Sequence, residues 1–179
     1  MPGTEYALQI KLEEAIGGFD SYAARCALKP VGEIDSIQVV YNEDWEIFEV
    51  RIFAWEPPTK DWYIFQVLRN GVLINDTIDE FWTTDDRFYN GNYTNGIMVA
   101  ILDPEDPTQK PEPGDTITLQ MSGITEEYYN FIVQLQDQTF QYRNPLFSGP
   151  PANVTTNIPE ATGFFAAYSK TYSSTIYEE

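Results

Sequence analysis

The sequence predicts a mainly β protein of the β-sandwich type that carries one packed α-helix near residues 125–139. Aromatic residues make up 15% of the 179-residue chain, and aromatic side chains favour the half-buried surface of a sheet. Short runs in which apolar and polar residues alternate recur along the chain, as in strands with one buried face. With 42% hydrophobic residues, the chain is long and apolar enough to bury a sizeable core.

The first two strands are expected to form a hairpin. Residues 6–12 alternate cleanly and residues 19–28 less cleanly, with Gly17-Gly18 between them. Because a two-stranded hairpin is marginal by itself, it must either join the sheet that follows or be the remnant of a sandwich whose earlier strands are missing. We expect residues 1–29 to be such a remnant of a truncated N-terminal immunoglobulin-like region. Residues 30–179 then form a β-sandwich-like domain. The open edges of the hairpin could pair with a second copy of the chain, which predicts a possible dimer.

The strands of the main domain follow from alternation and turn residues. They are expected at residues 34–41, 47–55, 62–69, 72–74, 97–102 and 116–122, with a final strand from Gly163 to Tyr172 that continues toward Tyr177. Asn70-Gly71 is the strongest turn signal, because both positions tolerate positive φ.

One segment has the spacing of a helix. Thr125 is a suitable N-cap, and Glu126 and Glu127 in the first turn favour the helix dipole. Apolar side chains then recur at helical spacing, at Tyr128, Ile132 and Leu135. We therefore expect a helix over residues 125–139.

Residues 76–95 are polar and long for a loop, which is typical of a functional or mobile segment. Its aromatic side chains could stack on a ligand, so we assign candidate ligand-binding roles to Trp82, Phe88, Tyr89 and Tyr93. Trp55 and Trp62, which flank a Pro-Pro turn, are expected in the core instead.

Charge and composition exclude several functions. The net charge is −18, from 10 basic and 28 acidic residues, so the chain repels phosphate backbones and no nucleic-acid partner is expected. No apolar run is long enough to span a membrane. Residues 1–4 lack the features of an export signal, so we expect either a cytoplasmic protein or a trimmed piece of an exported one.

The chain contains no histidine, which excludes Ser-His-Asp triads, Cys-His dyads and His-ligated zinc. We therefore assign no catalytic residue. The single cysteine, Cys26, is expected to be a buried small hydrophobe. Carboxylates remain as possible catalysts, since two facing acids can hydrolyse glycosidic bonds.

No cofactor is expected, with calcium as the alternative. Hard oxygen ligands are available at Asp85, Asp86, Asp103 and Asp106. No Asp-x-Asp-x-Asp-Gly loop is present to fix a coordination sphere, and acidic loops are usually only solvated.

Several motifs occur in a characteristic order along the chain. They are Pro2-Gly3-Thr4-Glu5-Tyr6, Ile34-Asp35-Ser36-Ile37, Gly114-Asp115, Tyr128-Tyr129 and a tail that runs from Asn144-Pro145 to Tyr168. In this order they resemble domain-of-unknown-function family 4249, a family of Bacteroidota cell-envelope proteins. The lipoprotein signal and the first strands of the N-terminal immunoglobulin-like region of that family are missing here.

The resemblance implies a cellular location and a kind of partner, but no catalysed reaction. Members look like outer-membrane lipoproteins encoded beside TonB-dependent receptors. We therefore expect a non-enzymatic cell-envelope accessory or binding module that works with an outer-membrane receptor protein or a small nutrient ligand. The alternatives are a carboxylate-based glycan-active enzyme and a structural or adhesive module.

Overall fold

The computed structural model describes residues 3–143 and 154–178, without the side chains of residues 140–143. Strands account for 47% of it and helix for 10%, which confirms the predicted mainly β fold. The chain divides into two compact units. Unit 1 consists of Met1–Pro30 and Ile124–Ser169, and unit 2 of Val31–Gly123 and Lys170–Glu179. The expected division into a remnant at residues 1–29 and a sandwich domain at residues 30–179 stays a prediction.

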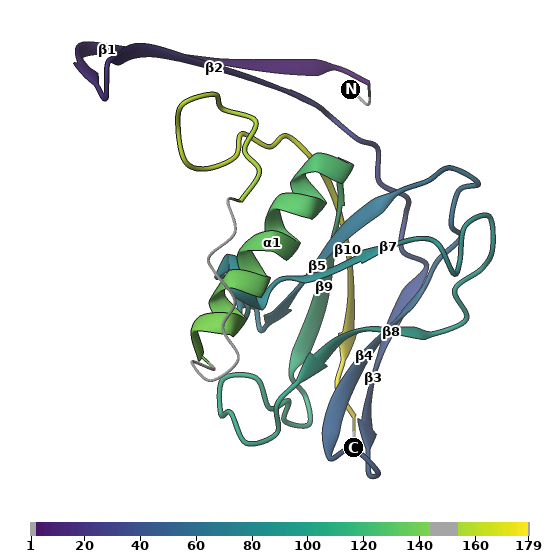
Figure 1. Cartoon of the computed structure of the whole chain (residues 1–179). Helices are drawn as coiled ribbons and strands as arrows, with labels where there is room; N and C mark the ends of the chain where they lie inside the picture. Colours follow the sequence, from purple (N-terminus) through teal and green to yellow (C-terminus); the bar gives the residue numbers. More distant parts are fainter. Residues whose placement is uncertain (1–2, 144–153, 179) are drawn as a thin grey trace. The chain divides into compact units, whose positions relative to one another are not determined.

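Unit 2 contains two sheets (Figure 1). The first has the order β3 (Ser36–Asn42), β4 (Ile47–Phe53), β8 (Ile97–Leu102). The second has the order β10 (Ser169–Ile176), β9 (Thr116–Ile124), β5 (Trp62–Arg69), β6 (Val72–Leu73), and β7 (Trp82–Asp85) also pairs with β5.

Apolar side chains from both sheets form one core cluster in unit 2. Val50 on β4 and Ile117 and Leu119 on β9 are completely buried in it. Each such side chain contributes about 1.5–3 kcal/mol when it leaves water. The core thus joins the two sheets as a sandwich.

The β5–β6 hairpin forms at the predicted turn. Arg69 pairs with Val72, and the two residues between them have positive φ, 51° at Asn70 and 81° at Gly71. This backbone matches the right-handed twist of the strands.

Unit 1 contains the predicted hairpin and helix. β1 (Glu5–Ile16) pairs antiparallel with β2 (Phe19–Ala27), and both glycines between them have positive φ. Helix α1 (Glu126–Arg143) begins where expected, since the Tyr128 amide donates to the Thr125 hydroxyl at 3.3 Å. Cys26 is buried, as predicted.

An aromatic cluster lies within unit 1. The ring of Tyr128 is 5.2 Å from that of Phe164 and 6.0 Å from that of Tyr168, and Phe131 is 5.2 Å from Phe164. The helix and the segment before β10 therefore meet through their rings.

Two elements differ from expectation. The polar segment 76–95 contains a short 3-10 helix, Ile78–Glu80, and the strand β7. The last strand starts at Ser169 rather than near Gly163, because the Asn157 side chain already bonds both backbone groups of Phe165, at 2.9 and 2.8 Å. The first part of the tail motif that runs from Asn144-Pro145 to Tyr168, residues 144–153, lies outside the described residues.

No helix in the described ranges combines the length and apolarity needed to cross a membrane.

Candidate functional site

Two loops of unit 2, residues 54–61 and 85–95, run beside each other and are called the loop pair. The Glu56 amide donates to the Asn92 carbonyl at 3.0 Å, and the Gly91 amide donates to the Pro57 carbonyl at 3.2 Å. These backbone bonds fix the loops that follow β4 and β7 and that lead into β5 and β8.

Three carboxylates converge inside the loop pair, and we call them the acidic cluster: Glu56, Asp61 and Asp86. One oxygen from each lies within 4.8 Å of the others. Asp86 is only 2% exposed, and its Oδ2 accepts no hydrogen bond from the part of the chain that the structure describes. Burying a carboxylate oxygen without a partner lowers the stability of the fold, so a ligand that pairs with this oxygen would be stabilising.

The surroundings of the acidic cluster raise the pKa of Glu56. Burial raises the pKa of Glu56 to about 7, and the negative charges of Asp86 and Asp61 act in the same direction. A hydrogen bond of 2.5 Å from the Tyr63 hydroxyl opposes this rise. Burial also raises the pKa of Tyr63, so its hydroxyl stays protonated and acts as a donor.

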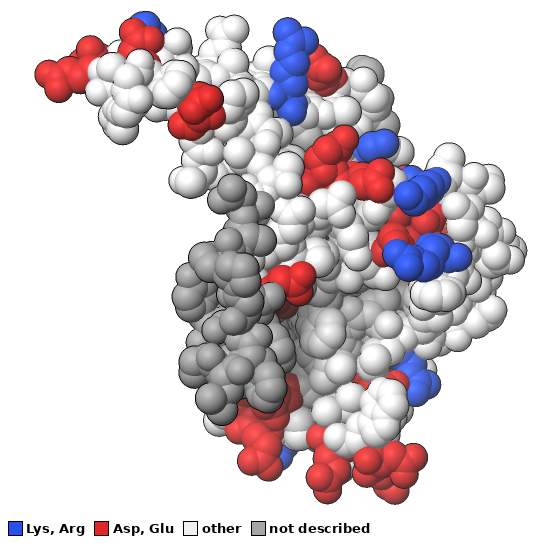
Figure 2. All heavy atoms as spheres, in the orientation of Figure 1, with Lys and Arg blue, Asp and Glu red and all other residues white. Residues whose placement is uncertain are grey.

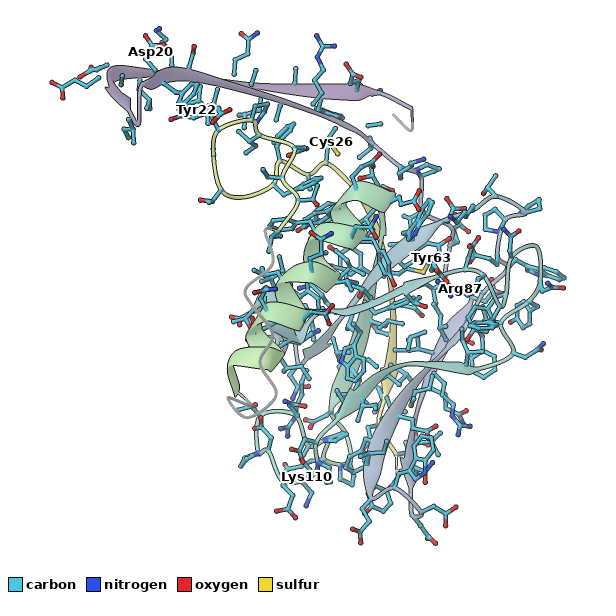
Figure 3. All side chains as sticks on the ribbon, in the orientation of Figure 1. Asp20, Tyr22, Cys26, Tyr63, Arg87 and Lys110 are labelled. Atoms are coloured by element: carbon cyan, nitrogen blue, oxygen red, sulfur yellow. The ribbon has the colours of Figure 1, made fainter. Side chains whose placement is uncertain are left out.

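Asp85 was predicted together with Asp86, but its carboxylate is held by an arginine. Arg87 Nε donates to Asp85 Oδ1 at 2.7 Å and to Oδ2 at 2.9 Å, and a second guanidinium nitrogen also bonds Oδ2. These bonds lower the pKa of Asp85. Figure 3 labels Arg87 and Tyr63, which lie near β7 and β5.

The other two predicted metal ligands, Asp103 and Asp106, cap turns of their own loop. Asp103 Oδ1 accepts from the Glu105 amide at 2.8 Å, and Asp106 Oδ1 accepts from the Thr108 amide at 2.8 Å. Neither belongs to the acidic cluster.

The predicted ligand-binding aromatics lie at the surface of unit 2. Phe88 is 80% exposed, and its ring is 6.4 Å from that of Tyr89. Tyr93 contacts Trp55, with 5.3 Å between the ring centroids. Trp55 is 68% exposed, so its predicted place in the core is wrong, whereas Trp62 is buried as expected.

Trp82 and Tyr89 line a hollow between β7 and β8, which are edge strands of the two sheets. Its volume is about 200 Å³, and β8 residues that include Met98 also line it. A second hollow of about 180 Å³ adjoins it, and the two share Trp82 and Ile101. Figure 2 shows this face hollowed between the two sheets. The structure therefore brings together two of the four predicted aromatics.

The sequence did not indicate Glu56 and Asp61 as candidate site residues. They lie on either side of the Pro-Pro turn, and Asp86 follows about thirty positions later along the chain. The proline pair marked a turn, but it gave no sign that the turn folds against the end of β7.

Comparison with known proteins gives one match. A family model described as "Domain of unknown function (DUF4249)" matches residues 1–174. Neither the curated proteins nor the solved structures contain a match.

Proposed function

The chain belongs to the DUF4249 family and carries an aromatic-lined hollow at its sheet edges. We propose that it is a non-enzymatic binding module of the cell envelope. The hollow between β7 and β8 is the observation that carries this proposal. Its partner is an extended segment of a receptor protein in the outer membrane.

The size of each of these two hollows, taken singly, favours a side chain of a protein segment over a free nutrient as its occupant. Pockets for small molecules usually enclose about 300–1,000 Å³, whereas these two enclose about 200 and about 180 Å³. Each is suited to a single side chain. Because the hollows adjoin at Trp82, two side chains of one extended segment could fill both.

The edge position of β8 in its sheet also favours an extended peptide as the partner. Among the described strands, β8 ends the order of its sheet. An extended peptide can add to such an edge, with main-chain hydrogen bonds for affinity and side-chain pockets for specificity. The hollow beside β8 is in the right place for those pockets.

The envelope setting rests on the motifs of the family. These motifs imply an outer-membrane lipoprotein encoded beside a TonB-dependent receptor, and we adopt that receptor as the partner. A large negative charge, −18, suits a protein that must remain soluble between other proteins at a surface.

The carboxylate-enzyme alternative has less support. Acids that cleave a glycosidic bond face each other across the substrate, at about 5–10 Å. Among the lining residues, the 180 Å³ hollow contains one acid, Glu80, and the 200 Å³ hollow contains none. The acidic cluster lines neither.

Co-purification with the receptor encoded beside the gene tests the proposal. The full-length protein is expected to bind that receptor. Trp82→Ala is expected to weaken binding by about tenfold or more, because aromatic anchors in pockets dominate interface energies. Met98→Glu is expected to have an effect of the same size, because it puts an unpaired charge into the lining of the hollow. Trp45→Ala is the matched control, since Trp45 is 64% exposed in the turn after β3, outside the residues that line the hollow.

Circular dichroism and thermal melting must show that each variant is folded. No binding by the wild-type protein, or equal binding by all three variants, would contradict the proposal.

A further inference from the structure

We propose that the acidic cluster of Glu56, Asp61 and Asp86 is a divalent-cation site of the calcium type that fastens the loop pair. This site goes beyond the proposed receptor binding and does not depend on it, because it can be tested on the chain alone.

The unpaired oxygen of Asp86 is the first reason. Asp86 is buried, its Oδ2 has no hydrogen-bond partner within the described residues, and its carboxylate lies beside those of Glu56 and Asp61. A buried charge is tolerated when it is paired or coordinates a metal. A cation among the three carboxylates would give Asp86 the partner that it lacks.

The spacing of the oxygens is the second reason. Ca²⁺ binds oxygen ligands at about 2.3–2.6 Å, so two of its ligands on opposite sides are about 5 Å apart. The three carboxylate oxygens lie within 4.8 Å of one another, which fits this sphere. Mg²⁺ usually keeps several waters and is bound through one or two carboxylates, so a cluster of three carboxylates suits Ca²⁺ better.

The neighbours of the acidic cluster hold its members in place, as is usual around metal ligands. The Tyr63 hydroxyl donates to Glu56 Oε1 at 2.5 Å, and the Thr59 hydroxyl donates to Asp61 Oδ2 at 2.5 Å. Each carboxylate keeps a further oxygen lone pair for a cation.

The backbone also fixes the position of Asp86. Its amide donates to the Asp61 carbonyl at 3.2 Å, and its own carbonyl accepts from the amides of Tyr89 and Asn90, both at 2.8 Å. These bonds form the turn that carries Phe88 and Tyr89. A cation here would therefore join both loops of the loop pair, because Glu56 and Asp61 lie in residues 54–61 and Asp86 lies in residues 85–95.

Calcium titration of the chelator-treated full chain tests the proposal. One Ca²⁺ is expected to bind, and saturation is expected to raise the melting temperature by about 5–10 °C. Mg²⁺ is expected to give a smaller shift. Tb³⁺, which binds at calcium sites, is expected to luminesce when the aromatic residues of the protein are excited, because the Tyr63 hydroxyl bonds Glu56.

The variant Asp86→Asn tests whether Asp86 is a cation ligand or an acid that only stabilises the fold. Without calcium this variant is expected to melt at or above the wild-type temperature, because it removes a buried charge, and its calcium affinity is expected to fall at least tenfold. Asp61→Asn is the second variant, for the case in which Asp86→Asn does not fold. Asp85→Asn is the matched control, since Arg87 rather than the acidic cluster holds that neighbouring acid, and its calcium affinity should match that of the wild type.

Two results would overturn the proposal. One is a melting temperature that does not respond to calcium at about 10 mM, a concentration well above the range of weak extracellular sites. The other is an equal response in the wild type and in both variants of the acidic cluster.

Discussion

At the scale of single residues, Asp115 shows how one acid joins the β5–β6 turn to the start of β9. Its carboxylate accepts from Arg69 Nε at 2.6 Å, from Asn70 Nδ2 at 2.6 Å and from the Glu112 amide at 2.8 Å. The amide of Glu112 and the side chains of Asn70 and Arg69 lower the pKa of Asp115. The negative form of Asp115 therefore stabilises the fold.

The lowered pKa of Asp115 predicts a loss of stability in acid. A carboxyl whose pKa is lower in the folded state contributes its full stability above the unfolded pKa, about 3.9 for aspartate. That contribution is lost as the pH falls through the lower, folded value. Denaturant unfolding between about pH 5 and pH 2 should show Asp115→Asn to be less stable at pH 5, with a difference from wild type that narrows toward pH 2. A constant difference would contradict this.

Gly96 combines positive φ with a close neighbour. Its φ is 76°, and an added Cβ would lie 2.6 Å from Phe53 Cζ. Gly96→Ala should therefore lower the free energy of unfolding by about 2–4 kcal/mol, through backbone strain and overpacking. Gly114→Ala isolates the strain, since Gly114 has φ of 95° in open space, and it should cost about 1–2 kcal/mol. Urea unfolding of both variants measures the difference, and equal losses would show that the Phe53 contact is unimportant.

At the scale of elements, those with local signals could be predicted from the sequence. The Asn-Gly turn and the Thr125 cap are specified by adjacent residues, so β5, β6 and α1 appeared where expected. β7 was missed because its four residues pair with a strand about twenty positions earlier, and the polar residues around it carry no alternation. The sequence predicted only some of the candidate site residues. Trp82, Tyr89 and Asp86 lie in a polar segment that is long for a loop, which marked it as a candidate site. Glu56 and Asp61 come close to Asp86 only through the tertiary fold, which no local pattern indicates.

The N-cap of α1 provides an element-scale test. Thr125→Ala removes the oxygen that accepts from the Tyr128 amide and should lower the free energy of unfolding by about 1 kcal/mol. Thr125→Ser keeps that oxygen and should stay much closer to wild type. Thermal or urea unfolding followed by circular dichroism measures both. Identical stabilities for Ala and Ser would show that the hydroxyl has no capping role.

At the scale of the whole molecule, the excess of negative charge affects stability. Twenty-eight acidic residues face ten basic ones, and self-repulsion of this kind opposes the compact state. Raising KCl from about 20 to about 300 mM shortens the range of this repulsion and should raise the melting temperature by a few degrees. The experiment requires a chelator, so that a divalent cation does not contribute. A melting temperature that falls with salt would mean that attractive ion pairs outweigh the repulsion.

Both compact units are discontinuous in sequence, and the pairing of β9 with β10 has a consequence for biosynthesis. β9 ends at Ile124 and β10 begins at Ser169, 45 positions later (169 − 124 = 45). At ribosomal rates of about 5–20 residues per second, the nascent β9 waits about 2–9 s for its neighbour. During that interval one side of β9 is unpaired, which makes this stretch of translation the point at which chaperones would be needed.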